Sequence, residues 1–174
     1  LLLVIILMLP FQDQLFSDDF AYAQSVRHFI NTGDLKVSER VAPSSIAFIV
    51  WGAIIAKILG FTLANLHFSV VILIPFLLFS LYELFILTGS SKQKSLILTL
   101  FFLSIPLIIY FTYTFLTIII FLVLEVFAIL FFLKGFKKSN LTFFIIAGIF
   151  SSAAFLTRQL GIIIPLAAAF SILL

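Results

Sequence analysis

The longest apolar run in the chain, residues 96–133, contains a single charged side chain, Glu125. A straight helix of that length would reach roughly 57 Å, because each helical residue adds about 1.5 Å. The hydrocarbon core of a bilayer is only about 30 Å thick. The run therefore has to fold back, and the aromatic and threonine side chains of residues 110–117 favour a turn there, at a membrane surface.

The rest of the chain is also typical of an integral membrane protein. Hydrophobic residues make up 64% of the sequence and charged residues only 10%, whereas soluble domains are nearer half apolar and a quarter charged. The basic residues form small clusters between apolar runs, which argues against nucleic acid as a partner. The absence of cysteine excludes disulfides and thiolate metal sites. We expect membrane spans at about 1–11, 66–88, 96–112, 114–133, 141–157 and 159–174.

The apolar run 46–64 can be interpreted in two ways. If it crosses the membrane, the lysine-bearing loops 88–95 and 134–140 lie on the same side as the acidic segment near the N-terminus. If it lies in the interface, those loops lie opposite that segment, which satisfies the positive-inside bias. Lys57 and Gly60 also interrupt the run. We favour the interfacial interpretation.

The predicted fold class is thus an all-α polytopic membrane protein. A transmembrane helix bundle carries an external first loop, residues 12–65, which contains interfacial helices. This topology places the acidic segment, the turn at 110–117 and Arg158 together at the external face. Because the sequence begins and ends inside apolar runs, we expect residues 1–174 to be the N-terminal part of one larger transmembrane domain.

The acidic segment has the pattern of a helix start. Ser17 supplies a capping hydroxyl, and Asp18 and Asp19 follow it at the positive end of the helix. The helix is predicted to run to about Thr32, with Gly33 ending it. These acids could simply stabilise a surface helix. Alternatively, a carboxylate held at the membrane surface could act as a general base on an acceptor hydroxyl or amine.

Four stretches occur in a specific order: SDDFAYAQSVRHFINTGDL, VAPSSIAFIVWGAIIAKILGF, YTFLTIIIF and AFLTRQLGIIIPL. Together they resemble the N-terminal half of the membrane glycosyltransferases of the C-type fold. The most similar group is the protein-mannosyltransferase and aminoarabinose-transferase-like family. The resemblance covers nearly the whole chain.

This resemblance implies an activity. The expected enzyme is a glycosyltransferase that moves a sugar from a polyisoprenyl-phosphate-linked donor to a lipid, glycan or protein acceptor, at the external face of a prokaryotic plasma membrane. The family's first acid, taken as the catalytic base, corresponds to Asp18, and its second corresponds to Asp19. The family's tyrosine three positions beyond the second acid corresponds to Tyr22. No cofactor is expected, and the need for a divalent metal stays open.

Two arginines are the remaining candidates for substrate binding. The family often has a basic residue at the position of Arg158, where a guanidinium can bind the donor phosphate bidentately. The alternative is an interfacial arginine whose side chain extends to lipid headgroups. Arg27, on the predicted acidic helix, is either a substrate contact or part of a solvated surface.

The sequence departs from the family pattern in the second external loop. The position usually occupied by an acid is Ile118, and the position usually occupied by a proline is Ile120. A non-catalytic relative that binds polyprenyl lipids is therefore one alternative. The other is a transporter or lipid flippase, which a carboxylate inside a span, Glu125, would suit.

Overall fold

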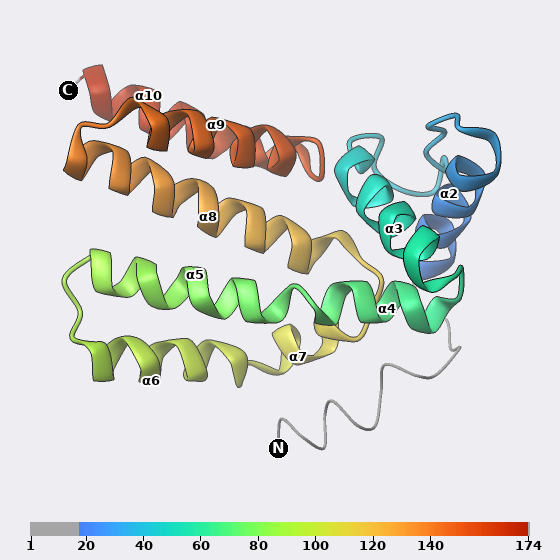
Figure 1. Cartoon of the computed structure of the whole chain (residues 1–174), viewed down its shortest axis with the longest axis horizontal. Coiled ribbons are helices and arrows are strands. Elements are labelled where there is room, and N and C mark those ends of the chain that lie inside the picture. The colour runs from blue at the N-terminus through green and yellow to red at the C-terminus, as the bar shows by residue number, and fades with distance from the viewer. Residues whose placement is uncertain (1–17, 174) are drawn as a thin grey trace.

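The computed structural model describes residues 18–173, which form helices joined by short connections (Figure 1). No strand occurs between residues 18 and 173, so the all-α prediction is confirmed for this part of the chain. The predicted first span, 1–11, and the predicted cap Ser17 lie outside it. The helices are α2 (Asp19–Thr32), α3 (Ile46–Leu59), α4 (Leu63–Val71), α5 (Ile74–Leu87), α6 (Lys92–Leu103), α7 (Pro106–Thr112), α8 (Thr117–Lys138), α9 (Leu141–Phe155), η1 (Gln159–Ile162) and α10 (Ile163–Leu173).

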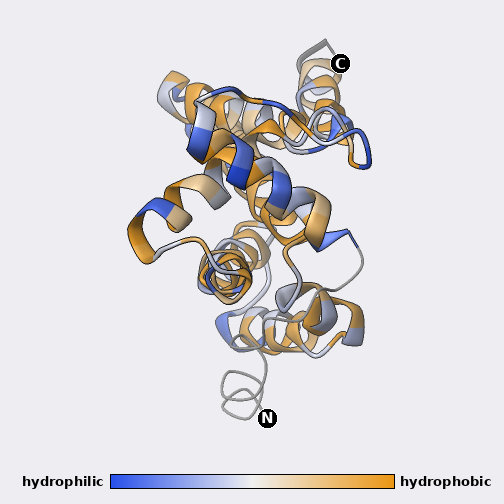
Figure 2. Ribbon diagram, turned by 90° about the vertical axis from the view of Figure 1, so that its right-hand side faces the viewer, coloured by the Kyte–Doolittle hydropathy of each residue, from blue (hydrophilic) through white to orange (hydrophobic). Residues whose placement is uncertain are grey.

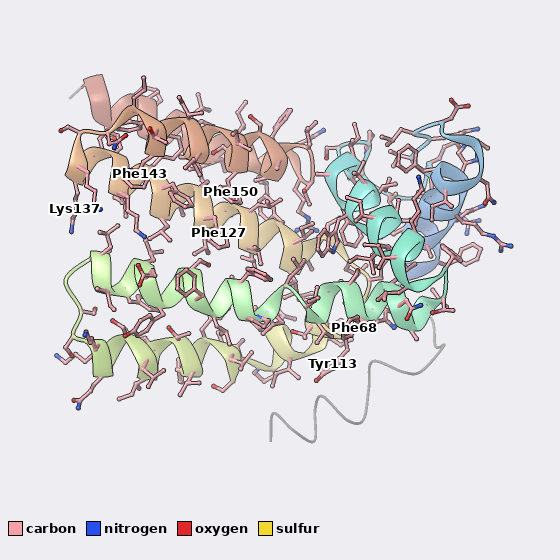
Figure 3. The ribbon with its side chains drawn as sticks, viewed as in Figure 1. Phe68, Tyr113, Phe127, Lys137, Phe143 and Phe150 are labelled. Carbon is pink, nitrogen blue, oxygen red and sulfur yellow. The ribbon has the colours of Figure 1, made fainter. Side chains whose placement is uncertain are left out.

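The long helices form a bundle in which α8 packs against both α5 and α9, and α6 packs against α5. Phenylalanine rings fill the α8–α9 contact: Phe150 stacks on Phe127 at 5.0 Å and on Phe131 at 5.7 Å (Figure 3). The outer faces of the bundle are apolar as well, and Figure 2 shows that most of the helical ribbon is hydrophobic. Ile97, Phe101 and Ile149 are all more than half exposed. Such surfaces are unfavourable in water and indicate an apolar surrounding.

In the described part of the chain, two helical segments are long and apolar enough to cross a membrane. Helices α4 and α5 together form one segment of 25 residues, Leu63–Leu87, and α8 has 22 residues. At about 1.5 Å per residue both exceed the roughly 30 Å of a bilayer core. These segments correspond to the predicted spans 66–88 and 114–133.

The predicted span 96–112 is not a straight helix. Helix α6 begins at Lys92, and its axis differs by 67° from that of α7. Pro106 explains the break, because proline has no N–H to continue the helical hydrogen bonds and its ring clashes with the preceding turn. The two pieces add a third crossing only if they form one broken span.

The predicted spans 141–157 and 159–174 are also shorter than expected. Helix α9 has 15 residues, which corresponds to about 22 Å, and the apolar helical segment after it covers residues 159–171. Each falls short of the roughly 30 Å needed to cross a bilayer core. Within residues 18–173, two to three segments are therefore long and apolar enough to cross a membrane, fewer than the five that the sequence pattern predicted for this part of the chain.

The segment 46–64 divides into two parts. Helix α3 has 14 residues, too few to cross a bilayer, and it packs against α2 and α4. It ends at Gly60, whose φ of 92° suits glycine. The side-chain amide of Asn65 donates to the carbonyls of Leu59 and Gly60, both at 2.9 Å. The spanning segment then begins at Leu63.

The predicted turn within 110–117 is confirmed: α7 ends at Thr112 and α8 begins at Thr117. This turn lies at the same end of the bundle as α2 and α3 (Figure 1). The opposite end carries the lysine-bearing connections. There Lys134 pairs with Glu83 at 3.3 Å, and Lys137 donates to the carbonyl of Leu87. We call these the acidic end and the lysine end.

Helix α2 ends where predicted but begins one residue later, with Asp18 at its N-cap in place of the predicted Ser17. It runs from Asp19 to Thr32, and Gly33 follows in the left-handed conformation with a φ of 78°. The N–H of Gly33 donates to the carbonyl of Phe29 at 3.0 Å, which closes the helix.

Gly52 allows α2, α3 and the turn before α8 to pack closely. A Cβ atom at this position would lie 2.6 Å from Cζ of Phe115 and 2.9 Å from Cγ2 of Val26.

We expect Gly52→Ala to destabilise the protein by about 1–3 kcal/mol through overpacking. The better helix propensity of alanine should offset up to about 1 kcal/mol of this loss. Thermal unfolding in detergent measures the change. Gly148→Ala is the control, since a Cβ there meets no atom within 4 Å; equal midpoints for the two variants would contradict the close packing.

Candidate functional site

The acidic end of the bundle is built on a buried pair of polar side chains. Asp19 is the first residue of α2, and His67 lies in α4. Nε2 of His67 is 2.8 Å from Oδ2 of Asp19, and both residues are fully buried. Because a carboxylate only accepts hydrogen bonds, the imidazole nitrogen is the donor. The pair joins the first turn of α2 directly to the segment Leu63–Leu87, which is long enough to cross a membrane.

The neighbouring acid, Asp18, has the opposite environment. It is exposed at the N-cap position of α2, and its side chain makes no capping hydrogen bond. Its backbone carbonyl accepts from the N–H groups of Ala21 and Tyr22, at 3.0 and 3.3 Å. The two adjacent acids therefore differ in access to solvent, and Asp18 is the one that can meet a ligand at the surface.

A row of aromatic rings connects α2 to the turn before α8. Tyr22 meets Phe48 edge-on, with ring centroids 5.2 Å apart, and Phe48 stacks on Phe115 at 4.3 Å. Tyr22 is 7% exposed, so its ring forms part of the core. Tyr113, in the same turn, is also buried, and burial raises the pKa of its phenol. Its hydroxyl is thus neutral at physiological pH.

Arg158 lies at the same end and is held in a defined orientation. Its Nε donates to Oγ1 of Thr117 at 3.0 Å, and its guanidinium carbon lies 6.0 Å from the ring centre of Phe121. This hydrogen bond uses Nε and leaves the two terminal nitrogens for another acceptor. The adjoining backbone is fixed too, since the N–H of Ala47 in α3 donates to the carbonyl of Leu156 at 2.9 Å.

The turn before α8 and the first turn of α8 contribute no acid here. Ile118 is half-buried in the first turn of α8, where the resembled family usually has a carboxylate. Between residues 18 and 173, no three His, Cys, Asp or Glu side chains lie close enough together to hold a metal ion.

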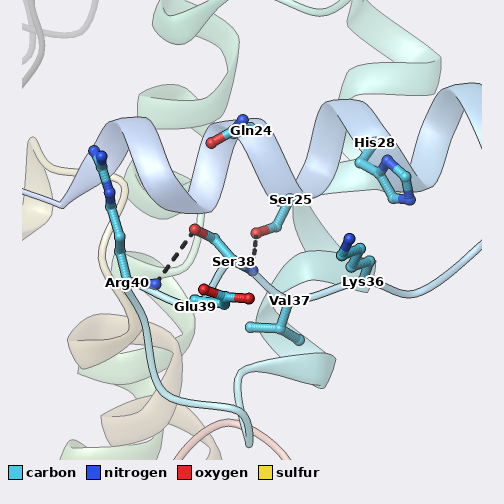
Figure 4. Close-up of a pocket in the computed structure, with 8 residues that line it drawn as sticks. All are labelled: Gln24, Ser25, His28, Lys36, Val37, Ser38, Glu39 and Arg40. Carbon is cyan, nitrogen blue, oxygen red and sulfur yellow. Dashed lines mark hydrogen bonds between the residues drawn. The ribbon is translucent and has the colours of Figure 1, made fainter.

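The fifth predicted site residue, Arg27, lies in α2. It is exposed on α2, and its guanidinium lies 5.8 Å from the ring centre of Phe61. Beside it, a pocket of about 370 Å³ opens between α2 and the loop that follows (Figure 4). None of the five predicted site residues, all of which are described, lines it. The lining residues are Gln24, Ser25, His28, Lys36, Val37, Ser38, Glu39 and Arg40.

We place the candidate site at Asp18 and Arg158 rather than in this pocket. Most of the pocket's wall is formed by residues 36–40, which are exposed or half-exposed. By contrast, Arg158 has a fixed orientation, and the backbone around Asp18 is anchored by a buried pair. Defined geometry of this kind is what a binding or catalytic site requires.

The sequence analysis missed His67 and Thr117. His67 is an ionisable residue inside an apolar helical segment, and such residues usually have a polar partner. That rule could have directed attention to the acidic segment, which holds two adjacent carboxylates, Asp18 and Asp19. Thr117 carries no comparable signal, because threonine is common at helix starts.

No protein-family model, curated protein or solved structure matches this chain.

Proposed function

We propose that this chain is part of a multi-pass membrane glycosyltransferase of the C-type fold, with its active site at the external face of a prokaryotic plasma membrane. The donor is a sugar linked to a polyisoprenyl phosphate, and the acceptor is a lipid, glycan or protein. One observation carries the proposal. An exposed carboxylate, Asp18, begins α2, an oriented guanidinium, Arg158, contacts the first residue of α8, and α2 and the start of α8 lie at the same end of the bundle. The order of the four sequence stretches adds support.

The proposed reaction needs few protein groups. Asp18 accepts the proton of the acceptor hydroxyl or amine as that atom attacks the anomeric carbon. The bond between that carbon and the phosphate oxygen breaks, and the phosphate leaves with the electron pair. The configuration at the carbon is inverted. Because phosphate is already a stable leaving group, the protein has only to stabilise its charge, which is the role of Arg158.

Location matters as much as chemistry for a donor of this kind. The polyisoprenyl chain lies in the bilayer, so its phosphate is found at the membrane surface. A binding group must therefore lie at the end of a spanning helix. Arg158 contacts Thr117, the first residue of the spanning helix α8, which is such a place.

Two observations favour functions other than glycosyl transfer. Ile118 lies where the family usually has an acid, which favours a relative that binds polyprenyl lipids without catalysis. Glu125 is half-buried inside the spanning helix α8, which favours a transporter or flippase. The variants below separate these functions from glycosyl transfer.

The first test concerns the base. In the full-length protein, Asp18→Asn should lower transfer from a polyprenyl-linked sugar by at least about 10²-fold, because amides do not accept a proton. The unfolding midpoint should change little, since Asp18 is exposed. Asp34→Asn, in the exposed loop after α2, is the matched control and should retain activity. Normal turnover by Asp18→Asn would refute the role.

The second test concerns the donor phosphate. Arg158→Ala should weaken donor binding by roughly 10- to 150-fold, the equivalent of losing a charged hydrogen bond worth about 1.5–3 kcal/mol. Arg158→Lys should restore only part of the affinity, because an ammonium cannot bind both to Thr117 and bidentately to phosphate. Donor binding in nanodiscs measures both variants. Unchanged affinity in Arg158→Ala would leave the arginine as a lipid-headgroup contact, and a parent that binds donor without transfer would favour the non-catalytic function.

The third test concerns membrane sidedness. The acidic end should face outward and the lysine end inward, as the positive-inside bias requires. Single cysteines replacing Asn31, Gln93 and Lys138, all exposed, can be labelled in intact cells with a membrane-impermeant reagent, in a background without other cysteines. Only Asn31→Cys should react. Labelling of Gln93→Cys or Lys138→Cys would overturn the proposed topology.

A further inference from the structure

The lysine end of the bundle carries positive charge that the described residues do not neutralise. Its lysines lie at the start of α6 and the end of α8: Lys92, Lys94, Lys134, Lys137 and Lys138. Only two acids follow residue 39 in the sequence. Glu125 lies inside α8, and Glu83 pairs with Lys134 at 3.3 Å. Within residues 18–173 the other four lysines form no ion pair, so their charges lack a counter-charge.

Two contacts unite the lysine-bearing connections into one surface. Lys134 of α8 reaches Glu83 of α5, and Lys137 donates to the carbonyl of Leu87, the last residue of α5. The connections α5–α6 and α8–α9 accordingly lie at the same end of the bundle (Figure 1), where Figure 3 shows Lys137. Clusters of about four to eight basic residues beside a spanning helix are typical of sites that bind anionic lipid headgroups.

A pocket with a largely apolar lining lies beside these lysines. It has a volume of about 370 Å³ and is lined by residues at the end of α8 and the start of α9: Gly135, Phe136, Ser139, Leu141 and Phe144. Leu141 is 72% exposed, an unfavourable state in water. Lys138 directly precedes Ser139, and its Nζ lies 5.5 Å from the ring centre of Phe143, the neighbour of Phe144.

We propose that the lysine end binds an anionic phospholipid, with an acyl chain in the α8–α9 pocket and the headgroup phosphate on the lysines beside it. A soluble anion would match the lysines but leave the apolar lining in water. An uncharged lipid would match the lining but leave the lysines without a counter-charge. An anionic phospholipid satisfies both, and α8 is long enough to end at the membrane surface where such headgroups lie. Lipid binding here does not depend on sugar transfer, because none of these residues has a part in the proposed reaction.

Lipid titration of the full-length protein in detergent, followed by native mass spectrometry, measures the affinity. Phosphatidylglycerol should bind more tightly than phosphatidylcholine. Lys137→Gln combined with Lys138→Gln should weaken phosphatidylglycerol binding by roughly 25-fold, because each lysine near an anionic headgroup contributes about fivefold, or about 1 kcal/mol. Lys36→Gln combined with Lys57→Gln is the matched control. It removes the same charge from exposed lysines at the acidic end and should keep the affinity.

A second pair of variants tests the apolar part of the site. Leu141→Gln should weaken phosphatidylglycerol binding by roughly tenfold, because a polar side chain no longer favours contact with an acyl chain. Leu160→Gln, which changes a leucine that is 58% exposed in η1, is the control and should have no effect. Glycerol phosphate, which carries the anion without acyl chains, should not displace the lipid.

The outcomes separate charge, pocket and general damage. Equal affinity for the two lipids, or an equal loss in the two lysine pairs, would overturn the role of the lysines. Unchanged affinity in Leu141→Gln, or displacement by glycerol phosphate, would overturn the role of the pocket. Lys137→Arg combined with Lys138→Arg keeps both charges and should keep the affinity; a loss there would refute a charge effect. If the glutamine pair does not fold, Lys138→Gln alone should still lose about fivefold. A parent that transfers no sugar would end the proposed function and leave these comparisons intact.

Discussion

The carboxyl group of Asp19 can be fully buried because the imidazole of His67 lies 2.8 Å from it. Removing one member of a buried polar pair typically costs about 3–5 kcal/mol, because the remaining buried group loses a hydrogen bond. The contact joins residues 48 positions apart in sequence. It attaches α2, the first helix described, to the segment Leu63–Leu87, which is long enough to cross a membrane. The rest of the acidic end is assembled around this attachment.

Three further contacts extend from the anchored helix to the bundle. The rings of Tyr22, Phe48 and Phe115 form a continuous row from α2 through α3 to the turn before α8. Backbone hydrogen bonding ties α3 to the end of α9, and Arg158 connects that end to the start of α8. Each of these links joins two elements at the acidic end of the bundle. The proposed site is therefore positioned by the bundle rather than by loops alone.

The proposed division of labour between the two acids follows from their surroundings. Adjacent carboxylates on a helix start look equivalent in a sequence, and either could be a base. In the structure only Asp18 is exposed, while Asp19 is engaged with His67. The chain has Ile118 where the resembled family usually has an acid. Nε of Arg158 donates instead to the hydroxyl of Thr117, so it needs no acid from the turn before α8.

The helical class, the C-terminal end of α2, the fold-back before Thr117 and the separation of the acidic and lysine ends could all be predicted from the sequence. These features depend on local signals such as apolar run length, turn residues and charge. It did not predict the bend before Pro106 or the shortness of α9 and α10, since hydropathy does not show where an apolar helix stops. The tertiary structure alone decided which acid is buried, that Tyr22 belongs to the core, and that His67 and Thr117 contact Asp19 and Arg158. The two hydrogen bonds join side chains 41 and 48 residues apart in sequence, and only packing brings such distant groups within hydrogen-bonding distance.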